Sequence, residues 1–308
     1  MSYAEEEIAG EGPPTTARLR AVLDRAARVV IVEAAPGEAD SADLPRLTVT
    51  GAGIGDLARH LAVVDGGTGD SCRCAGWPTI TVYDAQDTRL ARWTLHHQSG
   101  LRGLGDSDAD LRDGPALTAW LAERGLTRSR RVREELAEEE ARSEQRRTRW
   151  IRAAPDGLGR AAADVARPPA HDPGSWSGEL RRAEERLAAA ARREYPDSGE
   201  RIRLLLAWAG TSTRSSSGGS MWYDAAVLRL LLAEDPALLL AACAAAPLSP
   251  AELDGAAVLF ATVEWTTARG RQLPEPLRSW LIEHIEADGT DPMRFRMRHG
   301  YYGAERTV

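Results

Sequence analysis

The periodicity of the apolar residues changes along this chain, and that change most constrains the fold. Short β-branched or alternating runs occur near the start, at 29–32, 47–50, 79–83 and 90–97. From Glu179 onward the apolar residues recur at helical spacing, and several of these segments begin with proline, which is favoured in the first turn of a helix. We therefore predict an α+β fold, with a small N-terminal sheet and its helices followed by an all-α C-terminal helical bundle or short α-solenoid.

The composition of successive segments predicts how the 308 residues are divided. Such a length corresponds to two domains of about 150 residues each. The segment 128–152 contains nine Arg and six Glu, which is typical of a solvated helix with charge pairs one turn apart. We predict a disordered lead at 1–14, an α+β domain at 15–126, a charged connecting helix at 127–153, a linker at 154–178, an all-helical domain at 179–290 and a frayed basic and aromatic tail at 291–308.

Two missing residue types exclude several classes of enzyme. All 39 positive charges are Arg, because the sequence contains no Lys, and it contains no Asn. Without Lys there is no P-loop lysine, no kinase lysine and no Schiff base. Without Asn there is no Cys-His-Asn triad and no N-glycosylation site. The chain also has no Gly-x-Ser-x-Gly and no His-Glu-x-x-His motif, so no hydrolase signature selects a reaction.

Charge and hydrophobicity limit the partners and the location. The net charge is −7, and no run reaches about 18 apolar residues, so we expect a soluble cytoplasmic protein with no membrane partner. Another protein is the expected partner. Nucleic acid is expected only through the basic segments 128–152 or 294–302, and the acidic run inside the first of these opposes phosphate binding.

A glycine-rich turn and a serine-rich segment are two further candidate binding sites. The run from Gly51 to Gly55 follows a predicted strand and precedes a predicted helix, but its third glycine comes one residue too early for a dinucleotide fingerprint. It is typical of a simple strand-to-helix turn. Residues 211–220 contain hydroxyls and one Arg, which suit an anion, although the pattern favours a flexible connection between helices.

Two cysteines and two histidines form the main candidate site. Cys72 and Cys74 precede the predicted hairpin of 79–97, and His96 and His97 end it. A hairpin brings its outer ends together, so the four side chains should lie close to one another. Thiolates and imidazoles are good zinc ligands. Alternation along a strand predicts that only one of the two histidines faces the cysteines, and Asp70 or water is expected to complete the set.

Other chemistry at the same place remains open at this stage. A thiolate beside an imidazole, with Arg102 nearby in sequence, would be nucleophilic. Alternatively the region binds a ligand without a metal, with Arg102, Asp84 or Asp106 as polar partners. A third interpretation is that the cysteines are small apolar residues at a loop edge and the histidines merely finish a strand.

The same stretch resembles a known kind of protein. The residues that carry the resemblance are Cys72-x-Cys74, the following strand, Leu95-His96-His97, Ser99, Arg102 and a helix ending in Trp120-Leu121 and Gly125. Together they resemble the core of a bacterial (actinobacterial-type) protein family of unknown function. The resemblance covers about 55 residues and implies a site without naming its chemistry.

The sequence thus leaves two hypotheses from different classes. The first is an interaction or regulatory protein, of scaffold or immunity type, because the chain has a helical array, an acidic balance and no catalytic signature. The second is a metal-dependent or thiol-dependent enzyme that uses Cys72, Cys74, His96 and His97, with zinc as the expected metal.

Overall fold

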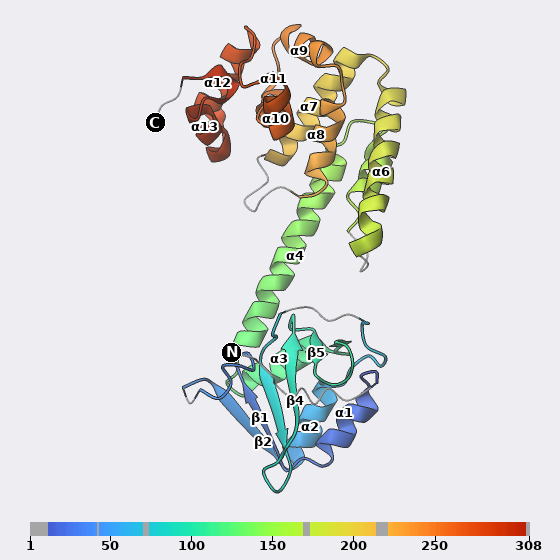
Figure 1. Ribbon diagram of the computed structural model, residues 1–308, viewed down its shortest axis with the longest axis vertical. Helices are drawn as coiled ribbons and strands as arrows, with labels where there is room; N and C mark the ends of the chain where they lie inside the picture. The colour runs from blue at the N-terminus through green and yellow to red at the C-terminus, as the bar shows by residue number, and fades with distance from the viewer. Residues whose placement is uncertain (1–11, 42, 70–73, 169–172, 214–220, 306–308) are drawn as a thin grey trace. The chain divides into compact units, whose positions relative to one another are not determined.

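The computed structural model describes residues 12–41, 43–69, 74–168, 173–213 and 221–305. The chain divides into two compact units, Met1–Ala141 and Arg142–Val308. The first contains an antiparallel sheet with helices and the second is helical, which confirms the predicted α+β class (Figure 1). In the described parts of the chain no helix is long and apolar enough to cross a membrane.

The sheet of the first unit has six strands in the order β2-β1-β3-β4-β5-β6, and all neighbours are antiparallel. The predicted runs at 29–32, 47–50, 79–83 and 90–97 correspond to its four longest strands. The strands are β1 (Arg28–Val32), β2 (Arg46–Thr50), β3 (Thr79–Tyr83), β4 (Arg89–His96), β5 (Gly100–Arg102) and β6 (Ala109–Asp110).

Three helices cover one face of this sheet: α1 (Thr16–Leu23), α2 (Ala52–His60) and α3 (Gly114–Glu123) (Figure 1). Ile31, Ile80 and Trp93 lie opposite one another on adjacent strands and are fully buried beneath the helices. The alternating run at 90–97 forms β4 and directs Ala91, Trp93 and Leu95 into this core. The opposite face of β4 is therefore left to its polar residues.

The charged segment forms one continuous helix, α4 (Arg128–Arg152), and the division between the two units falls within it. The buried carboxylate of Glu33 accepts a hydrogen bond from Arg128 N at 2.7 Å. A carboxylate is favourable there, since the first amides of a helix have no partner within it. The Arg128 guanidinium lies over the Trp77 ring, 4.3 Å from its centroid.

The second unit contains the last part of α4 and nine further helices among its described residues. Its core is built mainly from Leu, Ala and Trp side chains. The helices are α5 (Gly159–Val165), α6 (Pro173–Glu194), α7 (Ser198–Thr213), α8 (Asp224–Leu232), α9 (Pro236–Ala244), α10 (Pro250–Leu259), α11 (Val263–Arg269), α12 (Leu277–Asp288) and α13 (Asp291–Arg298), followed by a 3-10 turn, η1 (Tyr301–Gly303).

Helices α7 and α10 approach each other closely because each has a glycine at the contact. A Cβ on Gly210 would overlap the carbonyl of Ala251, and one on Gly255 would overlap the carbonyl of Leu206. The backbones therefore meet without intervening side chains.

Two predicted segments differ from the structure. The expected linker at 154–178 contains α5 and the first turn of α6, and Leu158 and Ala162 are fully buried there. The expected frayed tail at 291–308 is folded through the 3-10 turn that ends at Gly303: Met293 is fully buried, and the Tyr302 hydroxyl donates to Ala257 O at 2.8 Å. The first of these segments is alanine-rich and packs closely without the large apolar residues that make a core visible in sequence. Most of the predicted lead, residues 1–11, lies outside the described residues.

Candidate metal centre

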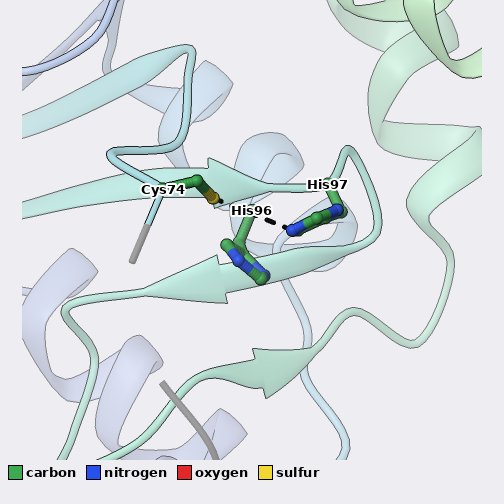
Figure 2. Close-up of side chains that lie close together, drawn as sticks. All are labelled: Cys74, His96 and His97. Atoms are coloured by element: carbon green, nitrogen blue, oxygen red, sulfur yellow. Dashed lines mark hydrogen bonds between the residues drawn. The ribbon is translucent and has the colours of Figure 1, made fainter. Parts of the chain in front are cut away.

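Three of the four predicted ligands lie together in the first unit. Cys74, His96 and His97 each offer a ligand atom, and these atoms all lie within 4.8 Å of one another. Figure 2 shows Cys74 beside the end of β4, with the two imidazoles next to it. Cys74 Sγ is 3.7 Å from His97 Nε2. Cys72 and Asp70 lie outside the described residues, so their predicted roles stay predictions.

Backbone contacts hold Cys74 beside the end of β4. Trp77 N donates to Leu95 O at 2.8 Å, and Leu95 N donates to Pro78 O at 3.1 Å, so the segment before β3 continues along β4. Gly76 has φ +70°, and a Cβ there would lie 2.7 Å from the Leu95 carbonyl oxygen. Glycine is therefore required for the close approach, as expected for a backbone crossing next to another.

The two histidines share the site because the strand ends between them. Regular pleating would direct consecutive side chains to opposite faces. Here β4 ends at His96, and His97 and Gln98 have φ of +51° and +58°. The prediction that only one histidine faces the cysteines is therefore wrong for Cys74. The two imidazole centroids are 4.1 Å apart, with the rings at 69°.

His96 has one ring nitrogen directed at a carboxylate and one without a partner. Its Nδ1 lies 3.7 Å from Asp108 Oδ2, and its side chain is 16% exposed. Its Nε2 is buried and has no hydrogen-bond partner among the residues that the structure describes. Buried polar atoms are nearly always satisfied, so an orphan at a candidate site needs an explanation. A metal ion bound by this nitrogen would supply one.

Arg102 and Asp108 form the second layer around the site. Arg102 donates from Nε to Asp108 Oδ1 at 2.8 Å and from Nη2 to Asp108 Oδ2 at 2.7 Å. The same guanidinium donates to the carbonyl oxygen of Cys74. Arg102 thus links the cysteine backbone to the carboxylate behind His96. Arg102 was predicted as a polar partner from the sequence, whereas Asp108 was not, because it precedes a strand of two residues, β6, that leaves no pattern in the sequence.

Asp84 has a different task from the one predicted. It lies in the turn between β3 and β4, at the opposite end of the hairpin from His96. Its Oδ1 accepts from Gln86 N at 2.9 Å and from Thr88 N at 2.8 Å. These bonds close the turn, as Asp commonly does. Asp84 is therefore a turn residue and not part of the site.

The distances are compatible with a tetrahedral zinc ion. Zn–S bonds of about 2.3 Å and Zn–N bonds of about 2.0 Å place sulfur and nitrogen about 3.5 Å apart across one tetrahedral edge. The 3.7 Å between Cys74 Sγ and His97 Nε2 is close to this edge. Both side chains are exposed, so side-chain rotation can close the longer separations within the cluster.

Comparison of the chain with protein-family models, curated proteins and solved structures gave no match.

Proposed function

We propose that the first unit binds a zinc ion through Cys74, His96 and His97. The observation that carries this proposal is the grouping of one sulfur and two imidazole ligand atoms within 4.8 Å. Thiolate and imidazole are the ligand types that zinc prefers. The orphaned Nε2 of His96 supports the proposal, as does the carboxylate of Asp108 behind that ring, because carboxylates commonly orient metal-bound histidines.

The exposure of the site bears on what the metal does. Cys74 and His97 are exposed, so solvent or a small substrate can reach an ion held between them. Three protein ligands with an open position are typical of catalytic zinc, which activates a bound water. We therefore propose a metal-dependent enzyme with hydrolytic chemistry. A fourth protein ligand, for which Cys72 is the predicted candidate, would instead make a closed, structural site.

One observation favours a second candidate for the same atoms. Without metal, the exposed Cys74 sulfur is within hydrogen-bond distance of His97 Nε2. An imidazole beside a thiol favours the thiolate, which is the nucleophile in thiol chemistry. The interaction or regulatory role predicted for the protein remains a prediction.

Metal analysis of the purified full chain tests the zinc proposal. After incubation with zinc and dialysis we expect about one tightly held ion per chain. Cys74→Ser and His97→Gln should each lose most of it, whereas His299→Gln, an exposed histidine on the other unit, should retain it. Wild-type protein that holds no zinc, or Cys74→Ser that holds as much as wild type, contradicts the proposal.

Two further measurements separate the alternatives. If Cys72 closes the site, Cys72→Ser loses zinc as Cys74→Ser does. If the site is open, Cys72→Ser keeps its zinc. The thiol candidate requires that metal-free Cys74 react with a disulfide probe faster than a free thiol, and that His97→Gln slow this reaction. An ordinary rate in both proteins contradicts it.

A further inference from the structure

The second unit contains a pocket of about 190 Å³ that is separate from the candidate metal centre. The last turns of α4 form one wall, and the C-terminal end of α7 and the start of α8 complete it. At about 30 Å³ of liquid volume per water molecule, the space suits about six waters or a small organic molecule. Its lining comprises Arg146, Arg149, Trp150, Ala153, Thr211, Ser212, Met221, Tyr223 and Asp224.

Two lining side chains have buried donors without a partner. Trp150 is 3% exposed and Tyr223 is 2% exposed. Within the described part of the chain, neither the indole N–H of Trp150 nor the hydroxyl of Tyr223 has a hydrogen-bond partner. Their rings lie against each other, with centroids 5.0 Å apart. By contrast, the indole of Trp208 in the same core donates to Trp150 O at 3.0 Å. Two orphaned donors at one pocket indicate a missing acceptor.

The charges of the pocket favour an anion. Arg146 and Arg149 contribute two guanidinium groups, and Asp224 contributes one carboxylate. That carboxylate already accepts a hydrogen bond from Met221 N at 2.9 Å and is largely buried. The lining is therefore rich in donors and carries a net positive charge. Guanidinium groups bind carboxylate and phosphate oxygens through paired hydrogen bonds.

The lining also offers apolar surface. Trp150, Tyr223, Ala153 and Met221 present aromatic and aliphatic groups beside the donors. Pockets for small molecules commonly combine an apolar lining with a few polar groups that fix orientation. Thr211 and Ser212 line the pocket, and they belong to the segment 211–220 whose hydroxyls suit an anion. Residues 214–220 lie outside the described part of the chain.

We propose that this pocket binds a small organic oxyanion, a carboxylate or phosphate ester with a planar apolar body. The oxyanion accepts from the Trp150 indole, the Tyr223 hydroxyl and the guanidinium of Arg146. The apolar body lies against the aromatic and aliphatic lining. This site is independent of zinc binding in the first unit, so either proposal can fail without the other.

Isothermal titration calorimetry of the full chain tests this site with three probes: benzoate, phenyl phosphate and inorganic phosphate. We expect one site per chain for at least one organic probe, and weaker binding of inorganic phosphate. The preference between benzoate and phenyl phosphate identifies the headgroup. Loss of a hydrogen bond to a charged ligand should weaken binding about tenfold in Arg146→Gln and in Tyr223→Phe. Arg152→Gln, an exposed residue further along α4 that does not line the pocket, should bind as wild type does.

Stability without ligand provides an independent readout. Tyr223→Phe removes only an unpartnered hydroxyl, so its melting temperature should equal or exceed that of the wild type. A purely structural Tyr223 would melt lower in this variant. Three results overturn the proposal: no saturable heat from either organic probe at millimolar concentration, inorganic phosphate binding as tightly as phenyl phosphate, or equal weakening in Arg152→Gln.

Discussion

His284 Nε2 lies 2.8 Å from Asp254 Oδ1, and both side chains are buried between α12 and α10. An unpaired polar group in such a core costs more than the hydrogen bond contributes. Asp254→Ala should therefore lower the free energy of unfolding by about 1–3 kcal/mol. Asp254→Asn retains an acceptor and should lose less. Urea denaturation of the two variants measures the difference, and equal losses would contradict the expectation that the Asn oxygen replaces the carboxylate as the partner of His284.

The contact between α7 and α10 predicts an intolerance to side chains. In Gly255→Ala the new methyl would overlap the carbonyl of Leu206, so the helices must separate. We expect a loss of about 1–3 kcal/mol or more, as is typical of overpacking. Gly159→Ala is the matched control, because its Cβ would meet nothing within 4 Å. Thermal melts of both variants test this, and a Gly255→Ala protein as stable as Gly159→Ala would contradict the close approach.

Glu252 predicts a dependence of stability on acid pH. Burial raises the pKa of this carboxyl, but hydrogen bonds from Arg203 and Ser249 outweigh burial, so the net pKa lies below its ordinary value of 4.5. A lowered pKa in the folded state stabilises the fold above pH 4.5 and stops doing so as the pH falls through the folded value. Arg203 Nε lies 2.7 Å from the carboxylate.

Melting temperatures between about pH 2 and about pH 7, a range that extends well below the ordinary pKa of a Glu carboxyl, check this dependence. Arg203→Gln should melt below wild type at neutral pH by the equivalent of about 1–2 kcal/mol. The two curves should converge in acid, where Glu252 is protonated in both proteins. A constant separation across the whole range would contradict the linkage.

Cys74 and Cys243 should differ in reactivity towards a thiol probe. Cys243 is fully buried, and burial raises the pKa of its thiol to about 12. A disulfide probe applied to the native protein should therefore leave Cys243 unmodified, because the thiolate is the reactive form. Cys74 is exposed and should react, and bound zinc should protect it. Mass spectrometry of labelled peptides checks each site. Labelling of native Cys243 at the rate of Cys74 would contradict its burial.

The second layer predicts an effect on zinc affinity. Asp108 lies behind His96 and is held by Arg102. Asp108→Ala should weaken zinc binding about tenfold or more while the three ligands remain, as is typical when a supporting carboxylate is removed. Asp84→Ala is the control, since Asp84 closes a turn at the other end of the hairpin. Competition with a chelating dye measures the zinc affinity of each variant. Equal affinities in Asp108→Ala and Asp84→Ala would show that Asp108 does not support zinc binding.

The sequence was sufficient for the four longest strands of the sheet and for the approach of the cysteine to the histidines. β-branched runs located β1 and β3, and the hairpin geometry brought Cys74 near the end of β4. That both imidazoles lie beside Cys74 could not be predicted, since the pattern of polar and apolar residues does not show a left-handed backbone at a histidine. Asp108 was equally invisible, because a two-residue strand leaves no periodicity to detect.

The helical unit shows a different limit. Most of its helices were predictable from spacing, but α5, the division of α10 from α11 and the packed C-terminal residues were not. Segments such as 159–166 bury mainly alanine, and 291–303 buries isolated residues such as Met293 and Tyr302 among arginines that are partly or fully exposed. Their burial depends on neighbours distant in sequence. The sequence also does not show that the donors of Trp150 and Tyr223 lack an acceptor, because this depends on the atoms that surround them in the fold.

The left-handed backbone at His97 sets the stability of the fold against metal ligation. A residue with a Cβ in that region is strained by about 1–3 kcal/mol, and glycine would relieve most of this strain. A chain selected only for robustness would therefore favour glycine at position 97, which has no imidazole to offer. Histidine at position 97 therefore lowers the free energy of unfolding of the metal-free protein, and a bound metal ion would offset this loss.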